Sequence, residues 1–370
     1  MIYLDNAATT YPKPNCVYEA INYGMKNYSF NSGRGIYKYA TKTFKMINQT
    51  REKIADFVNT KGDRVVFTSS ATESLNNIIY GLQIQEGDTV LISPFEHNAI
   101  VRTLYAIKSN IELIPFDKNT WKLNENKLRD ILVLKKPKAI IISHISNVTG
   151  FMLPYTKIFE FGKKFGTINV LDSAQGFGIY KVNTEFIDFV VFAGHKSLYA
   201  MFGIAGFVNI SNYNLKKIKV GGTGSDSLNL EMPETMPEKY EAGSLNSVGI
   251  YCLNKSIDFL KTLDFEKKEK DLTIYALEKL RKLEKITIYC PEEIIPNGII
   301  SFNVDGYTSD EVGIILSEDY DICVRTGYHC APFVHDFIDS KKYSGTIRIS
   351  IGIFNTIEEI DSLINALEVL

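Results

Sequence analysis

The sequence has few cysteines, and none of them form a recognisable pair. The 370 residues include five cysteines, an odd number, and no two are spaced as Cys-x-x-Cys. This scattered distribution argues against a disulfide framework and against a structural zinc site, so we expect no metal. The five are Cys16, Cys252, Cys290, Cys323 and Cys330.

Long apolar runs and an excess of one charge are also absent. No segment approaches the roughly 20 consecutive apolar residues of a membrane span. The opening residues, MIYLDNAATTYPKP, lack the basic and apolar regions of a secretion signal. We therefore expect a cytoplasmic protein with no membrane contact. The 41 Lys and Arg nearly balance the 43 Asp and Glu, which favours a small-molecule substrate over nucleic acid.

Apolar runs rich in valine and isoleucine alternate with amphipathic segments. The runs predict strands that helices cover on both faces. They lie at residues 64–70, 88–94, 138–144, 167–173, 189–195 and 204–210. Apolar residues spaced three or four apart predict helices at 71–83, 98–110 and 154–166. This alternation predicts a large α/β domain of three layers.

The pattern changes after about residue 250. Residues 251–285 form a long, charged, amphipathic stretch. The segments at 297–307, 321–327 and 345–355 predict strands of a smaller mixed sheet. We expect two domains. Their boundaries are 15–248 for the large domain, and 1–14 with 249–370 for the small domain.

Reactive side chains follow the predicted strands. His97, Asn147 and Asp172 each come soon after apolar residues, and His195 and Lys196 follow the apolar residues 189–193. Because ligands of open α/β sheets bind at the carboxyl ends of the strands, these side chains are candidates for one site. An acid or a lysine is rarely buried without a partner, which favours a functional role.

A bound pyridoxal phosphate would give each of these residue types one role. Lys196 would form a Schiff base with the aldehyde, and Asp172 would pair with the pyridine nitrogen. His97 would stack on the ring, and Gln175 would bond the ring hydroxyl. The hydroxyl-rich segment at 68–74 would hold the phosphate at a helix start. An ordinary helix cap is the alternative for that segment.

Nine motifs resemble, in order, those of cysteine desulfurases in the class V aminotransferase superfamily. They are YLDNAATTYPKP, GRGIYKYA, FTSSATES, EHNA, HISNVTG, LDSAQ, GHKS, YEAGSLN and VRTGYHCA. RTGYHCA is more similar to the SufS and selenocysteine-lyase-like branch. The resemblance implies the fold type I of pyridoxal-phosphate-dependent transferases, with a large three-layer domain on a mainly parallel seven-stranded sheet and a small α+β domain. It also implies a homodimer with active sites at the subunit interface.

The resemblance assigns further residues to the site. Positions that hold the phosphate in the family are matched by Ala71, Thr72, His195 and, from the other subunit, Thr223, with Ser225 as its alternative. Asn147 matches a substrate or cofactor contact. Arg348 matches the arginine that grips the substrate carboxylate, with a structural salt bridge as the alternative. Arg34 and Arg325 match additional active-site arginines.

Cys330 is the catalytic nucleophile under this resemblance. It would attack the sulfur of L-cysteine and leave a persulfide on the enzyme and alanine as product. The thiolate is the reactive form, which His329, nearby arginines or the substrate could favour. A metal site of Cys330, His329 and His335 is disfavoured because adjacent ligands cannot easily share a tetrahedral centre. An inert loop cysteine is the other alternative.

Two positions depart from the family pattern. Ala193 stands where a serine usually helps to hold the phosphate, and Tyr328 replaces a common histidine. The expected function is cysteine desulfuration, with sulfur passed to an acceptor protein for iron–sulfur cluster assembly or for thiolated molecules. The alternatives are a selenocysteine lyase acting on L-selenocysteine, a class V aminotransferase or kynureninase-like lyase that uses no thiol, and a nucleotide-binding or scaffold protein.

Overall fold

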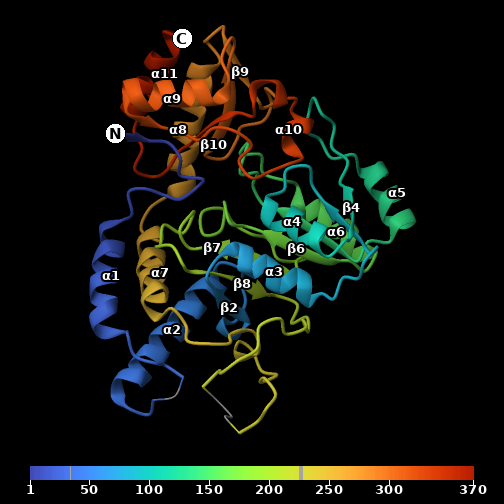
Figure 1. Ribbon diagram of the computed structural model, residues 1–370, viewed down its shortest axis with the longest axis vertical. Coiled ribbons are helices and arrows are strands. Elements are labelled where there is room, and N and C mark those ends of the chain that lie inside the picture. The colour runs from blue at the N-terminus through green and yellow to red at the C-terminus, as the bar shows by residue number, and fades with distance from the viewer. Residues whose placement is uncertain (34, 225–227) are drawn as a thin grey trace.

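A seven-stranded sheet forms the centre of the computed structural model, which describes residues 1–33, 35–224 and 228–370 (Figure 1). The strand order is β2-β8-β7-β6-β5-β3-β4. The strands are β2 (Val65–Thr68), β3 (Thr89–Ile92), β4 (Asn110–Leu113), β5 (Ala139–Ser143), β6 (Ile168–Asp172), β7 (Phe189–Ala193) and β8 (Ala205–Asn209). Only β8 runs antiparallel to its neighbours. The expected mainly parallel seven-stranded sheet is therefore confirmed.

Helices cover both faces of this sheet, which explains why its inner strands are continuously apolar. In β5, Ile140 and Ile142 belong to one core, and Ala139 and Ile141 belong to the other, because successive side chains point to opposite faces. One face is covered by α3 (Ala71–Gly81) and α4 (Asn98–Ala106). The opposite face is covered by α2 (Lys38–Asp56), α5 (Glu125–Lys135), α6 (Tyr155–Lys164) and α7 (Ser247–Leu260).

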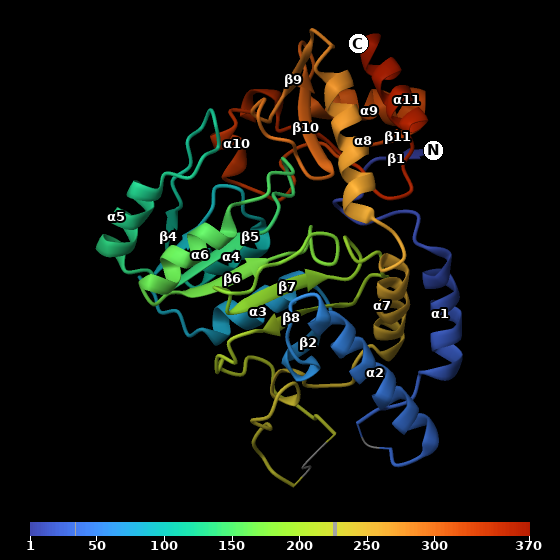
Figure 2. The same cartoon turned by 180° about the vertical axis from the view of Figure 1, so that it is seen from behind.

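A smaller group of elements packs beyond the carboxyl ends of the large sheet. It contains the antiparallel sheet β12-β10-β9 and the parallel pair β1-β11. Its strands are β1 (Ile2–Tyr3), β9 (Ile286–Ile288), β10 (Ile299–Val304), β11 (Ile322–Cys323) and β12 (Ile347–Ser350). Its helices are α8 (Phe265–Leu280), α9 (Ser309–Tyr320), α10 (Val334–Phe337) and α11 (Ile357–Glu368). Both chain ends lie in this group (Figure 2).

The N-terminal residues join the small group because β1 pairs with β11 and Leu4 packs in its core. The chain then passes to α1 (Asn15–Asn27), which packs beside α7 at the edge of the large group (Figures 1 and 2). The predicted boundary after residue 248 falls inside α7, whose Ile250 and Leu253 pack in the core of the large sheet. The domain division stays a prediction.

The long amphipathic stretch at 251–285 is two helices, α7 and α8. They are separated at Asp264, whose side chain accepts a hydrogen bond from Lys267 N and caps α8. Within the described residues, every helix is too short or too polar to cross a bilayer.

Candidate functional site

A cavity of about 270 Å³ lies at the carboxyl ends of β5, β6 and β7, between the two groups of elements. It is lined by residues that follow separate strands and by residues of the small group. The predicted site residues that it brings together are Ala71, Thr72, His97, Asn147, Asp172, Gln175, His195, Lys196, Arg325, Cys330 and Arg348. The convergence follows from the shared strand direction, since parallel strands end at the same edge.

An acid and an amine meet at the centre of this cavity. Asp172 ends β6, and its Oδ1 accepts a hydrogen bond from Ala174 N at 3.0 Å. Lys196 follows β7. Burial raises the pKa of Asp172, and burial lowers the pKa of Lys196 to about 8. A lowered pKa leaves more of the amine as free base, which is the nucleophilic form.

His97 occupies the N-cap of α4. Its Nδ1 accepts a hydrogen bond from Ala99 N at 3.0 Å, so this nitrogen carries no proton. Burial lowers the pKa of His97 to about 4, and the charge of Lys196 adds to the effect. The imidazole is therefore neutral at physiological pH, with its proton on Nε2.

The start of α3 and His195 form an anion-binding corner. Ser70 caps α3, and its Oγ accepts a hydrogen bond from Glu73 N at 3.1 Å. Ala71 and Thr72 come next, where the first backbone N–H groups of a helix have no partner within the helix. The two interpretations of this segment are thus compatible, because a capped helix start still offers N–H groups to an anion.

His195 is the second part of this corner. Its ring stacks on that of Phe202, with centroids 4.6 Å apart. Burial lowers the pKa of His195 to about 4. The buried Ala193 ends β7 and has no hydroxyl, so it leaves the anion one donor fewer than the serine of the family pattern.

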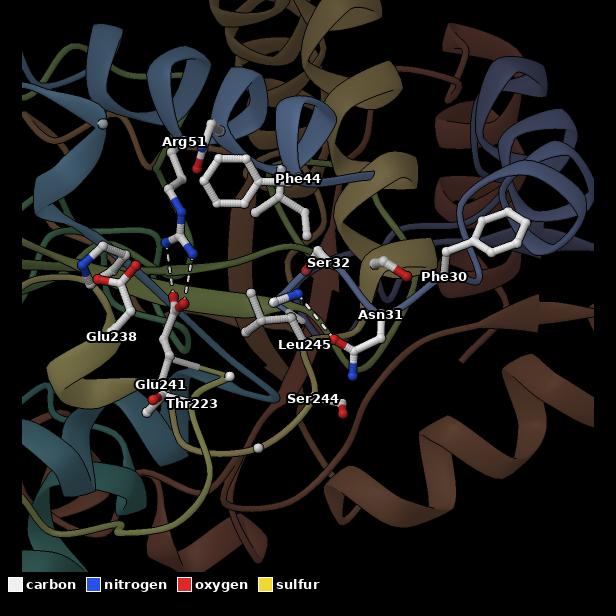
Figure 3. A pocket seen from close by; sticks show the side chains of 18 of the residues that line it. Phe30, Asn31, Ser32, Phe44, Arg51, Thr223, Glu238, Glu241, Ser244 and Leu245 are labelled. Atoms are coloured by element: carbon white, nitrogen blue, oxygen red, sulfur yellow. Dashed lines mark hydrogen bonds and ion pairs between the residues drawn. The ribbon is translucent and has the colours of Figure 1, made fainter. Parts of the chain in front are cut away.

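Thr223 lies elsewhere in this chain. It lines a larger cavity of about 660 Å³ together with Phe30 and the ion pair of Arg51 with Glu241 (Figure 3). Its predicted contact is with the site of a second subunit, so its distance from Lys196 within one chain neither supports nor opposes that role. Arg34 and Ser225 lie outside the described residues.

Arg348 is held from two sides on β12. Its Nη2 donates to Asp5 Oδ1 at 2.6 Å, and its Nη1 donates to the carbonyl of Asn147 at 2.8 Å. The salt bridge that was the alternative to carboxylate binding is therefore present. Arg348 Nε is buried without a partner, and the Arg348 side chain lines the cavity beside Arg325. The guanidinium is thus oriented by Asp5 and still has a donor for a ligand.

Cys330 lies at the mouth of the cavity, in a segment whose backbone is held firmly. Both His329 and Cys330 have positive φ, 47° and 57°. Each carbonyl from Gly327 to Cys330 accepts a hydrogen bond. The carbonyl of Gly327 accepts from Thr346 N at 3.0 Å, and that of Tyr328 accepts from His335 Nε2 and Ala331 N, both at 3.0 Å. The carbonyl of His329 accepts from Asn147 Nδ2 at 2.8 Å, and that of Cys330 accepts from Asn98 N at 2.6 Å. The thiol itself is exposed.

His329 is a neutral acceptor beside this thiol. Its Nε2 lies 3.0 Å from the carbonyl of Thr346 and 2.8 Å from that residue's Oγ1. Since a carbonyl can only accept, Nε2 carries the proton and Nδ1 does not. Burial lowers the pKa of His329, and the charge of Arg348 lowers it further. His329 therefore cannot stabilise a thiolate as a cation, although Nδ1 can accept a proton.

The side chain of Tyr328 points away from this arrangement. It is half-exposed and packs edge-on against the ring of His335 at 5.1 Å. His335 is fixed by Ser340 and by the carbonyl of Tyr328. In the part of the chain that the structure describes, no three His, Cys, Asp or Glu side chains are grouped so as to hold a metal ion.

The cavity is suited to a polar, anionic ligand. Among the described residues, it contains four buried polar atoms that lack a hydrogen-bond partner. They are Asn147 Oδ1, His195 Nδ1, His329 Nδ1 and Arg348 Nε. Because buried polar groups are nearly always satisfied, a ligand that bonds them completes the site. The helix start fits a phosphate, Asp172 fits a protonated ring nitrogen, and Lys196 fits an aldehyde.

Two carboxylates of the site were not identified from the sequence. Asp5 lies in the motif YLDNAATTYPKP and Glu96 lies in the motif EHNA, so both belong to motifs of the family resemblance. Glu96 is fully buried and accepts hydrogen bonds from Ser143 N at 3.0 Å and from Ser143 Oγ at 2.7 Å. Ser143 is the register partner of Asp172. Burial raises the pKa of Glu96 to about 7.

Comparisons with known proteins agree with this geometry. The family described as Aminotransferase class-V matches residues 2–363. A probable cysteine desulfurase of Methanothermobacter thermautotrophicus is 30% identical, over 99% of this chain and 94% of its own. A cysteine desulfurase of Wigglesworthia glossinidia brevipalpis is 34% identical, over 99% and 92%. The apo structure of a cysteine desulfurase from Thermococcus onnurineus superposes with a TM-score of 0.91 at 28% identity, covering 99% of this chain and 94% of that one.

Proposed function

Because this chain belongs to the class-V aminotransferase family, we propose that it is a pyridoxal-phosphate-dependent cysteine desulfurase. It converts L-cysteine to L-alanine and leaves a persulfide on Cys330. The observation that carries the proposal is that Lys196, Asp172, Arg348 and Cys330 line one cavity. A thiol at the mouth of a site with an amine, an acid and an arginine suits removal of sulfur from an amino acid.

The residues of the cavity fit the proposed cofactor. The start of α3 and His195 would hold the phosphate, and Asp172 would keep a proton on the ring nitrogen. Gln175 would offer its amide to the ring hydroxyl, and its Nε2 donates to the carbonyl of Ala7 at 3.0 Å. When bound, pyridoxal phosphate supplies an electron-poor ring that stabilises negative charge at the substrate Cα.

The remaining residues bind and convert the substrate. Arg348 grips the carboxylate of L-cysteine with the donors that Asp5 and Asn147 leave free. Lys196 would hold the cofactor through its aldehyde, and once released as a free amine its lowered pKa suits it to move the Cα proton. Arg325 adds positive charge to the same wall, which favours the anionic substrate.

Cys330 performs the sulfur transfer. Its thiolate attacks the substrate sulfur, so that a sulfur–sulfur bond forms while the substrate Cβ–S bond breaks. The electron pair of the broken bond stays on the carbon fragment, whose Cβ takes up a proton and becomes the methyl group of alanine. No external oxidant is needed, because the two electrons that the sulfur atoms lose on forming the persulfide are taken up by the substrate Cβ.

We also propose that the enzyme is a cytoplasmic homodimer. Four large apolar side chains that are near, in sequence, to residues lining the larger cavity are fully or mostly exposed. They are Ile36, Val220, Leu228 and Leu230. A second copy would remove them from water and would bring its Thr223 to the phosphate. An acceptor protein would then take the persulfide sulfur, with iron–sulfur cluster assembly as the proposed destination.

The test is a stoichiometric assay of alanine and protein-bound persulfide from L-cysteine. Cys330→Ala should lower alanine formation at least 100-fold while the visible absorbance of the bound cofactor is kept. Cys16→Ala, on α1 away from the cavity, should match the wild type. If Cys330→Ala still forms alanine from L-cysteine at the wild-type rate, the nucleophile is wrong. Retained turnover of L-selenocysteine in Cys330→Ala would show that the thiol is needed for sulfur alone.

A further inference from the structure

Four hydrogen-bond donors of one N-terminal segment converge on a single backbone oxygen, the carbonyl of His195. Thr9 Oγ1 and Thr10 N each lie 3.1 Å from it, and Thr10 Oγ1 lies 3.2 Å from it. Lys13 Nζ completes the set at 2.9 Å. A carbonyl oxygen has two lone pairs, so this oxygen is surrounded by more donors than it needs. The peptide that leads into Lys196 is therefore clamped.

Lys13 is the charged member of this clamp. Its Nζ also donates to Thr10 Oγ1 at 2.7 Å, and the side chain is partly buried. Within the described residues, its contacts are with a carbonyl and with hydroxyl oxygens, and no carboxylate forms an ion pair with it. Burial lowers the pKa of Lys13 to about 7. Burying an amine without a counter-ion destabilises its charged form, and such groups are rarely buried without a functional reason.

The other end of the same segment reaches the substrate side of the cavity. Asp5 bonds Arg348, and Asn6 Nδ2 donates to the carbonyl of Ser350 at 2.9 Å. The carbonyl of Ala7 accepts from Gln175 Nε2. Residues 5–13 thus connect the arginine of the small group with the lysine that follows β7, and Lys13 is the last anchor of this connection.

We propose that Lys13 is a positioning residue for Lys196. The amine of Lys196 stands at the end of a flexible side chain, so the accuracy of its placement depends on the backbone from which it extends. Lys13 Nζ donates both to the carbonyl of His195 and to Thr10 Oγ1, so it ties that backbone to the N-terminal segment. Where the amine is protonated, its charge strengthens both hydrogen bonds. The inference rests on the proposed function, because it assumes that Lys196 holds the aldehyde of the cofactor.

The experiment compares Lys13→Met and Lys13→Arg with the wild type. All three enzymes are loaded with pyridoxal phosphate, and the visible absorbance is titrated from pH 6 to 10 beside steady-state kinetics on L-cysteine. In Lys13→Met we expect kcat to fall about tenfold with KM changed less than threefold, because orientation and not binding is lost. The midpoint of the absorbance titration should rise by about half a unit, because a nearby positive charge is removed.

Two controls separate positioning from general damage. Lys13→Arg should stay within threefold of the wild-type kcat and keep the wild-type midpoint, since it restores a charged donor. Lys26→Met, on the exposed end of α1, should behave as the wild type. A Lys13→Met enzyme with the wild-type midpoint and kcat would overturn the inference.

A second pair of variants covers the case in which Lys13→Met does not fold. Thr9→Val and Thr10→Val each remove a hydroxyl donor to the same carbonyl oxygen. Each should lower kcat by a smaller amount and keep the wild-type midpoint, because a hydroxyl donor is lost and no charge is removed. A wild-type kcat in both variants would overturn the inference. A wild-type protein that develops no visible band with pyridoxal phosphate would overturn the proposed function and this inference with it. If the wild type shows the visible band and Lys13→Met has the wild-type kcat and midpoint, the inference is wrong but the proposed function stands.

Discussion

Arg348 of β12 and Asp5 of the N-terminal segment form an ion pair within the small group of elements, with Nη2 and Oδ1 2.6 Å apart and only 3% and 18% of the two side chains exposed. The acid compensates most of the charge of a buried guanidinium and fixes its plane. Asp5 is 343 residues away from its partner in the chain. Arg348, the proposed substrate-binding arginine, is thus oriented by the N-terminal segment.

Asp5→Asn should raise KM for L-cysteine about tenfold, because a less well oriented guanidinium loses about 1.4 kcal/mol of carboxylate binding. The expected change in kcat is less than threefold, since the reacting atoms are untouched. Steady-state kinetics measure both constants. Asp271→Asn, on the exposed face of α8, is the matched control, and an unchanged KM in Asp5→Asn would contradict the role of Asp5.

The uptake of pyridoxal phosphate should depend on pH through Lys196. Because burial lowers the pKa of this amine to about 8 from its ordinary 10.5, its reactive free base grows as pH rises and is nearly complete by pH 9. We expect the rate of absorbance change on mixing cofactor with cofactor-free enzyme to rise about tenfold from pH 7 to 9 and then level. An amine of ordinary pKa would show a rate that still rises tenfold from pH 9 to 10.

Glu96 should make stability fall as pH rises. Its folded pKa of about 7 exceeds the unfolded value of 4.5, so the folded state binds more protons between these limits. The contribution is fully present below pH 4.5 and is lost as pH rises through 7. Glu96→Gln has no such proton to lose. Its free energy of unfolding relative to the wild type should therefore increase by about 2–3 kcal/mol from pH 4.5 to 7.5.

Urea denaturation of the cofactor-free proteins at each pH measures this difference. Glu292→Gln changes an exposed carboxyl in the same way and should show no comparable trend. A Glu96→Gln variant whose relative stability does not vary with pH would mean that Glu96 is ionised throughout the folded range.

The ion pair of Arg51 with Glu241 should be costly to break. Both side chains are 5% exposed, and Glu241 also accepts from Phe67 N at 2.7 Å. Glu241→Ala leaves a buried guanidinium without its counter-ion and should lower the free energy of unfolding by about 3–5 kcal/mol. The double variant Arg51→Met with Glu241→Met should recover most of this loss in urea denaturation. A single variant within 1 kcal/mol of the wild type would show that water compensates the arginine.

Much of the large sheet could be predicted because its inner strands are buried on both faces. The six predicted apolar runs contain β2, β3, β5, β6, β7 and β8. The seventh strand, β4, was implied only by the family resemblance. It lies at the sheet edge, where Asn110 is exposed and Glu112 is partly exposed. An exposed edge strand needs no continuous apolar run, so the pattern of β4 is weak. β2, at the opposite edge, is buried along its whole length and was predicted.

The predicted site residues came from the rule that ligands bind at strand ends, and the structure brings most of them to one cavity. Residues that act from the opposite side could not be found in this way. Asp5 and Lys13 precede every strand of the large sheet, and their partners Arg348 and His195 are distant in sequence. A single sequence contains no signal for such pairings.

The hydrogen-bonded carbonyls from Gly327 to Cys330 restrict how sulfur can leave the enzyme. A cysteine on a flexible loop could move its persulfide sulfur out toward an acceptor. The backbone of Cys330 is instead held by hydrogen bonds at four successive carbonyls. The nucleophilic atom of a sulfur acceptor must therefore reach Cys330 at the mouth of the cavity. The shape of that entrance, and not the reach of the enzyme, decides which recipients are served.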